Sequence, residues 1–249
     1  MRAEASLRVI AIVAALSVGC VSSSVMETGR ALEQGEHRLT SGFAAGWQHE
    51  GMIGYAMPGE GDEEWRGGDD FPFFPHQLEW MVRSSHGAGG GIQGDVAIIS
   101  PTPMGLGMEL GLKWQLPVGE ELFAVAVNAR GGGGFTGYGS PEEGFAAVLG
   151  HLDGGLIASV HPGDRHAVYA SPRVRTDGLY HRVWSDDGSD DATGRAMSWG
   201  GALGVKLGRE VDELFVETVL LHTPRGDEPD GLRVVVGVGV RGDGGRLPW

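Results

Sequence analysis

The side chains most able to do chemistry in this sequence are charged groups that fall at alternate positions among glycine, alanine and serine. Alternate residues of an extended strand point to the same face, so these charges would share one face of a sheet. Enclosed together, they would have to pair or stay hydrated, because an unpaired buried charge is costly. The set comprises Glu79, Arg83, Glu109, Lys113, Arg173, Arg175, Lys206, Glu217 and Arg233, with Asp95, Arg130 and Arg241 in equivalent positions.

Two functions fit a charged face of this kind inside a barrel. Salt bridges across the interior would close and stiffen the barrel, which suits a structural or surface-binding protein. Alternatively, the same charges would line a narrow diffusion channel and select among solutes. The sequence leaves both functions open.

Other signatures of chemistry are missing from the sequence, which has no Gly-x-Ser-x-Gly, no His-Glu-x-x-His, no phosphate loop and no Cys/His cluster. The run Asp186–Asp191 has the carboxylate density of a Ca²⁺ site but lacks the EF-hand spacing, so we interpret it as a solvated loop. We interpret Gly131–Gly134 as a flexible loop. His49 beside Glu50 makes a rim protease conceivable, with no motif to support it. We therefore expect no enzymatic activity, no catalytic residue, no cofactor and no metal.

Period-two alternation over most of the chain predicts strands with two different faces. The clearest example is Leu232–Arg241, in which leucine and valine alternate with arginine and glycine over most of the segment. Ten stretches alternate in this way: Leu39–Gln48, Gln77–Ser84, Gly91–Ile99, Gly105–Leu116, Glu121–Arg130, Leu152–Val160, Ala167–Thr176, Arg195–Gly208, Glu213–Thr223 and Leu232–Arg241.

The composition of the two faces indicates which face points inward. A soluble, lipocalin-like barrel would turn its Leu/Val/Trp face inward around a ligand. Here the other face is mostly small residues with scattered charges, which suits a polar lumen, while Leu, Val and Trp suit lipid. We therefore predict an all-β, antiparallel up-and-down transmembrane β-barrel of about ten strands. A lipocalin-like ligand-binding barrel tethered by lipid remains the alternative.

Connection lengths agree with a membrane barrel, which has short turns on the periplasmic side and longer loops outside. Three long links are predicted: His49–His76, Gly131–His151 and Asp177–Gly194. If the N-terminus is periplasmic, the tight turns fall on the periplasmic side and the long links fall outside.

Composition narrows the function classes further. The chain has 249 residues, 45 of them glycine, and a formal net charge of −14. Interior glycine destabilises helices, which argues against a helical bundle. A protein with this net negative charge is a poor candidate for binding the phosphate backbone of a nucleic acid. We therefore expect no nucleic-acid partner.

The N-terminus reads as an export signal. Arg2 and Arg8 precede an apolar run that ends near Val18, which is the layout of a signal peptide over residues 1–19. Cys20 is the only cysteine. The sequence Leu16-Ser17-Val18-Gly19-Cys20 resembles the lipobox of bacterial lipoproteins, which implies lipidation of Cys20. Residues 20–36 are then expected to be a lipidated tether and residues 37–249 the barrel domain.

A wider resemblance covers residues 20–241. Its carriers are Thr28–Leu32, Gly35 and Glu36 before the first strand, Pro75–Arg83, and Tyr169-Ala170-Ser171-Pro172-Arg173. With the lipobox, these resemble outer-membrane β-barrel lipoproteins of unassigned function in myxobacteria-like genomes. The resemblance implies the outer membrane of a Gram-negative bacterium, lipid anchoring at Cys20, and membrane lipid, lipoprotein-export and barrel-assembly machineries as partners. It carries over no catalytic residues and leaves the oligomeric state unknown.

Strand pairing predicts one contact inside the barrel. Counting from the turn near residues 210–211, Lys206 should lie opposite Phe215 or Glu217, so we predict a Lys206–Glu217 ion pair. Counting from the next loop, Glu217 should lie nearer Gly237 or Gly239 than Arg233.

Overall fold

The structure is a computed structural model that describes residues 25–49, 77–101, 105–118, 122–140, 142, 144–163, 165–185, 188–209, 212–224 and 231–243. Ten strands form one sheet: β1 (His37–His49), β2 (Gln77–Gly89), β3 (Ile92–Pro101), β4 (Gly105–Gln115), β5 (Phe123–Gly139), β6 (Gly144–Val160), β7 (His166–Ser185), β8 (Gly188–Arg209), β9 (Asp212–Thr223) and β10 (Gly231–Asp243).

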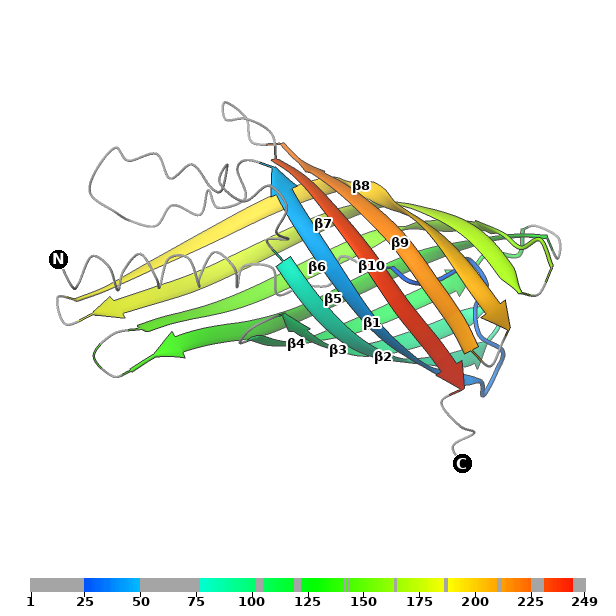
Figure 1. Cartoon of the computed structure of the whole chain (residues 1–249), viewed down its shortest axis with the longest axis horizontal. Helices are drawn as coiled ribbons and strands as arrows, with labels where there is room; N and C mark the ends of the chain where they lie inside the picture. Colours follow the sequence, from blue (N-terminus) through cyan, green and yellow to red (C-terminus); the bar gives the residue numbers. More distant parts are fainter. Residues whose placement is uncertain are drawn as a thin grey trace.

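The sheet is a closed antiparallel barrel in which every strand pairs with its neighbours in sequence (Figure 1). Closure comes from β1 and β10, which pair from Arg38 opposite Asp243 to His49 opposite Leu232. The predicted all-β, ten-stranded up-and-down barrel is therefore confirmed. No helix among the described residues is long and apolar enough to cross a membrane.

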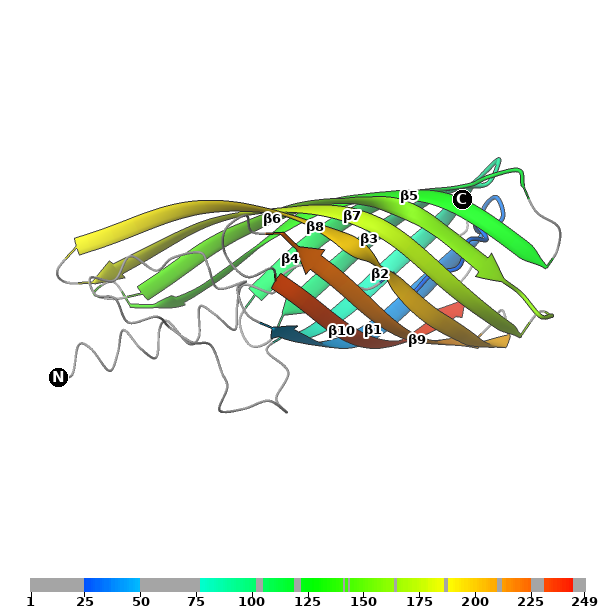
Figure 2. The same ribbon diagram turned by 90° about the horizontal axis from the view of Figure 1, so that it is seen from above.

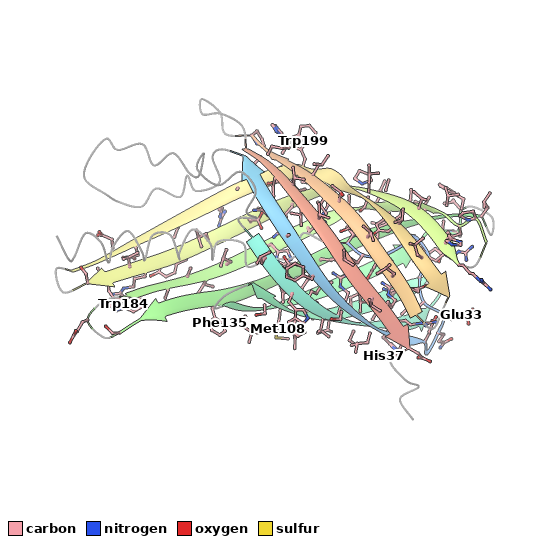
Figure 3. All side chains as sticks on the ribbon, in the orientation of Figure 1. Glu33, His37, Met108, Phe135, Trp184 and Trp199 are labelled. Atoms are coloured by element: carbon pink, nitrogen blue, oxygen red, sulfur yellow. The ribbon has the colours of Figure 1, made fainter. Side chains whose placement is uncertain are left out.

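The two faces of the barrel differ in polarity. In β4 and β10 exposed residues alternate with buried or partly buried ones along almost the whole strand. The exposed set is apolar and includes Leu110, Leu152 and Leu203, each more than 60% exposed. Met108, Phe135 and Trp199 likewise project from the outer surface (Figure 3). The interior carries arginine, lysine, glutamate and aspartate, which is the reverse of the apolar interior expected of a lipocalin-like barrel.

The two ends of the barrel also differ, and we name them by their connections. The turn end carries the connections β2–β3, β4–β5, β6–β7 and β8–β9. At the β2–β3 connection Gly89, Gly90 and Gly91 all have positive φ, a conformation that favours glycine. The opposite end, which we call the hairpin end, carries the β5–β6 and β7–β8 connections.

At the hairpin end, β5 to β8 extend well beyond the other strands (Figure 2). The predicted long links Gly131–His151 and Asp177–Gly194 are wrong, since both are mainly paired strand. Gly131–Gly134 belongs to β5, and β7 and β8 pair as far as Ser185 opposite Gly188. Antiparallel pairing continues through these stretches despite their glycine and aspartate content, because each strand is templated by its neighbour.

Several sequence predictions lie outside the described residues. These are the signal peptide at 1–19, Cys20 and its lipidation, and most of the first long link at 50–76. Asp186 and Asp187 also lie outside them, whereas Asp190 and Asp191 belong to β8 and are exposed.

Candidate functional site

Residues 25–36 enter the barrel and lie in its lumen. The sequence predicts a tether here, but Val25, Met26, Glu27 and Thr28 are buried. In Figure 1 the segment is the dark blue trace near the end where β1 starts. We call residues 25–36 the plug; they run from the middle of the barrel at Val25 to the turn end at Glu36.

Glu27 lies at the centre of a cluster of cations from the barrel wall. One carboxylate oxygen, Oε2, is 3.3 Å from Lys113 Nζ and 3.4 Å from an Arg130 nitrogen. The other oxygen, Oε1, is 3.6 Å from Arg83 and 4.0 Å from Arg241. The Glu27 side chain is fully buried. Four cations from β2, β4, β5 and β10 thus converge on one carboxylate.

Glu217 of β9 holds the start of the plug through its backbone. Its two carboxylate oxygens accept hydrogen bonds from the amides of Val25 at 2.7 Å and Met26 at 2.9 Å. The Tyr169 hydroxyl donates to the same carboxylate at 2.8 Å. Gly204 makes room for this tyrosine, because a Cβ there would lie 2.2 Å from the ring. The described hydrogen bonds of the Glu217 side chain therefore all join it to the plug or to Tyr169.

The rest of the plug is bound mainly through its main chain. Lys113 donates to the Thr28 and Arg30 carbonyls, while the amides of Ala31 and Leu32 donate to the side-chain oxygens of Gln115 and Gln93. At the turn end, the Gly35 amide donates to the Gly87 carbonyl. Because the wall binds mainly the backbone of residues 25–36, no pattern of side chains in this segment predicts the site.

A second small network holds Gly29. Its amide donates to Ser159 Oγ at 2.9 Å, and Ser159 lies 2.8 Å from His161 Nε2. Burial, with lesser effects from Arg30 and Lys206, lowers the pKa of His161 to about 4. The ring beside the Ser159 hydroxyl is therefore uncharged at neutral pH.

The barrel wall is shaped to the plug by glycines. Met26 has a φ of 44°, an unusual conformation for a non-glycine residue. A Cβ at Gly42 or Gly239, which are paired neighbours on β1 and β10, would lie 2.7 or 2.5 Å from the Met26 sulfur. A Cβ at Gly87 would lie 1.9 Å from the Glu33 carbonyl oxygen. The tight fit of chain and wall favours one seated position of the plug.

The structure places all nine predicted lumenal charges in the interior, each no more than 8% exposed. Arg83 and Glu109 form an ion pair at 3.3 Å. Arg173 pairs with Asp153 and Arg175 with Asp177. These contacts join neighbouring strands or residues of one strand, except Arg83–Glu109, which spans from β2 to β4. Glu79 and Arg233 are buried on the same face.

The predicted Lys206–Glu217 ion pair is wrong, although the strand register from which it is predicted is right. Lys206 lies opposite Phe215, and Glu217 lies opposite Gly237, as expected. Lys206 instead donates to Glu213 at 2.8 Å, the diagonal neighbour on the other side of Phe215. Glu217 is occupied by the plug, which the sequence did not predict to be in the lumen.

The interior of this acidic protein has an excess of buried positive charge. The described strands bury eight cationic side chains, Arg83, Lys113, Arg130, Arg173, Arg175, Lys206, Arg233 and Arg241, and six carboxylates, Glu79, Asp95, Glu109, Asp153, Glu213 and Glu217, and a seventh carboxylate, the partly buried Asp177, pairs with Arg175. The described residues hold no group of His, Cys, Asp and Glu arranged for a metal. Such a lumen is suited to hold a carboxylate, and Glu27 supplies one.

The sequence does not predict the site carboxylates Asp153, Glu213 and Glu27, and the reasons differ. Asp153 and Glu213 obey the same alternation as the predicted charges, so a stricter count of inward positions finds them. Glu27 obeys no alternation, and only the path of the chain brings it into the lumen.

Comparison with known proteins gives fold likeness alone. No protein-family model and no curated protein matches the chain. Solved structures that resemble it include Ail, the attachment invasion locus protein of Yersinia pestis, at 10% identity and a TM-score of 0.35, covering 84% of this chain and 99% of Ail. The translocator domain of the autotransporter NalP from Neisseria meningitidis matches at 11% identity and a TM-score of 0.44, covering 96% and 95%. Because these values are low, function is inferred below from the residues of this chain.

Proposed function

We propose that this chain is an outer-membrane β-barrel lipoprotein of a Gram-negative bacterium, with a structural or surface-binding role through its outer loops. The observation that carries this proposal is the polarity of the closed barrel, which is the reverse of that of a soluble barrel. Exposed leucine, valine and tryptophan encircle it, while paired charges fill its interior. In water such an outer surface would be an aggregation hazard, whereas in lipid it is the stable arrangement.

A role without transport is favoured by the plug. It contacts wall residues of β1 to β6, β9 and β10, including Gly42, Arg83, Arg130, Ser159 and Glu217. A lumen crossed by a hydrogen-bonded segment does not suit free diffusion. The narrow diffusion channel is therefore the second candidate for the state seen here.

A surface-binding role is favoured by the hairpin end. The tip of β8 is exposed on both faces, as Ser189, Asp190 and Asp191 are. The described pairing of β8 with β9 begins at Trp199, so the β8 residues before it pair only with β7 among the described strands. The two hairpins are joined where Trp184 Nε1 donates to the Ser140 carbonyl at 2.9 Å (Figure 3). A free strand edge of this kind can accept an extended partner segment.

Lipidation of Cys20 would tie the plug to the membrane. Five residues span at most about 17 Å, so an acylated Cys20 would lie within that distance of Val25. Metabolic labelling with a palmitate analogue should mark the wild type, and Cys20→Ser should abolish the label. Label that persists on the serine variant would refute the lipoprotein assignment. Export and barrel-assembly machineries are the expected partners.

Two measurements test the location and the role. An epitope inserted after Ser189 should be detected on intact cells, while the same epitope after Gly163, at the turn end, should need permeabilised cells. Photo-reactive side chains at Asp190 and Thr193 should give discrete adducts, and a matched probe at Val238 on the apolar face should not. Detection only after permeabilisation at both positions would contradict the proposal.

A further inference from the structure

The cation cluster around Glu27 has the composition of an anion site that is occupied by a residue of the same chain. Lys113, Arg130, Arg83 and Arg241 reach the carboxylate from four different strands. Arg83 and Arg130 also donate to the Val25 carbonyl, and Arg241 to the Met26 carbonyl. The same cations thus bind a carboxylate and the backbone oxygens beside it.

Wall acids neutralise this cluster only in part. Glu109 is 3.3 Å from Arg83 and 4.0 Å from Arg130, and it is also bound by His151. Asp95 accepts a hydrogen bond from Gln93 at 2.9 Å. Glu213 is 3.6 Å from Arg241, and it also binds Lys206 at 2.8 Å. Removal of Glu27 would therefore leave four cations beside two acids, Glu109 and Glu213, which are themselves shared with other groups. A buried positive charge left in this way attracts a replacement anion.

The plug is built to be separable from the wall. It forms no β-ladder with the strands. Two backbone hydrogen bonds join Gly35 and Glu36 to Gly87 of β2, and most of its other hydrogen bonds end on side chains such as Glu217, Lys113 and Gln115. The barrel closes by β1–β10 pairing without any contribution from residues 25–36. Departure of the plug therefore costs polar contacts but breaks no strand pairing.

We propose that residues 25–36 are a displaceable plug, and that the Arg83, Lys113, Arg130 and Arg241 cluster is an anion-selective constriction for chloride and small carboxylates once Glu27 has left it. The inference rests on the proposed membrane location and adds a transport state that the closed barrel does not have. The ligand class follows from the group that now occupies the site, which is a carboxylate.

The test is planar-bilayer conductance of the full-length chain and of two variants that unseat the plug by different means. Glu27→Lys places a cation among four cations. Gly29→Val acts by size alone, because a Cβ at Gly29 would lie 2.5 Å from the Ala124 carbonyl oxygen and 3.0 Å from that of Ile157. The matched controls are Glu33→Gln, at an exposed carboxylate of the same segment, and Gly94→Ala, where a Cβ meets nothing within 4 Å.

The expected result is silence in the wild type and both controls, and at least a tenfold rise in open time in both variants. Under a tenfold KCl gradient the reversal potential should have the sign of chloride permeation, and currents should persist in potassium acetate. Adding Arg130→Gln to the Gly29→Val variant should reduce the anion preference.

Each alternative outcome contradicts one part of the proposal. Variants that show the heat-shifted gel mobility of a folded barrel yet stay silent refute the plug, and cation-selective currents refute the anion site. If Glu27→Lys does not fold, Glu27→Gln, which keeps the side-chain size, takes its place under the same criteria. If high salt extracts the wild-type protein from membranes, the proposed membrane location is refuted instead. Failure of the plug and failure of the membrane location are therefore distinguishable.

Discussion

The turn end and the hairpin end of this barrel differ in what covers the two faces of their β-strands. At the turn end the strands have lipid-compatible residues outside, and all of them except β7 and β8 contact the plug inside, so both faces are covered. At the hairpin end β7 and β8 continue with residues such as Arg182, Asp190 and Asp191 that are exposed to water. Strand pairing alone sustains the second region, whereas the first also depends on buried polar contacts. Substitutions should therefore cost much at the turn end and little at the hairpin end.

The largest expected difference concerns the outer surface. Val236→Arg places a cation on the apolar face of β10 and should lower the free energy of unfolding in lipid by about 2–4 kcal/mol. Thr193→Arg, on an exposed stretch of β8, should change it by less than about 0.5 kcal/mol. Reversible unfolding in lipid vesicles by guanidinium measures both. Equal effects would mean that the apolar face does not contact lipid.

The next difference concerns glycine. Gly87→Ala should destabilise the barrel by about 1–3 kcal/mol, because the new methyl group would overlap the Glu33 backbone. At Gly178, on β7 towards the hairpin end, the nearest atom to a Cβ is 4.0 Å away, so Gly178→Ala should be neutral or slightly stabilising. The same unfolding measurement compares them. A neutral Gly87→Ala would contradict the seated position of the plug.

The ion pair of Lys206 gives a smaller effect. Alanine substitutions of Lys206 and Glu213 should be non-additive by about 0.5–1 kcal/mol, as expected of a contacting pair near the barrel end. The pair Lys206 and Glu217 should be additive, because Glu217 is bound to the plug and Tyr169. Double-mutant cycles on unfolding free energies decide between the two partners. Coupling to Glu217 alone would restore the pairing predicted from sequence.

The smallest effect concerns pH. In the folded protein the pKa of His161 is lowered to about 4, so the unfolded chain binds a proton at higher pH than the folded one. The stability that this neutral ring contributes is present above about pH 6.5 and is lost as the pH falls towards 4. His161→Gln should flatten the profile in that window, whereas His166→Gln, at an exposed ring, should not. A profile unchanged by His161→Gln would contradict the neutral ring.

Prediction from sequence succeeded where a residue's role depends on its own strand. Alternation in Leu232–Arg241 identified the faces of β10 and the inward direction of Arg233 and Arg241. Turn positions identified the register that sets Lys206 opposite Phe215. Both inferences need only the period of a strand and the length of a turn.

Prediction from sequence failed where a neighbouring strand or segment determines the structure or the contacts of a residue. The stretch 131–151 looks like a loop by composition, yet β5 and β6 remain paired through it, with Gly132 opposite His151. Lys206 was assigned the wrong partner because two carboxylates, Glu213 and Glu217, lie diagonally from it. The occupation of Glu217 by the Val25 and Met26 amides settled the choice.

The sequence by itself determined the ten-stranded barrel, its charged interior and its apolar exterior, because these follow from the alternation of side chains along each strand. The tertiary structure decided what fills the barrel. The plug is bound through backbone groups and a single carboxylate, Glu27, whose importance comes from four cations that are 56 to 214 residues away in the chain. Convergence of that kind leaves no periodic signal, since it depends on where the closed sheet places its strands.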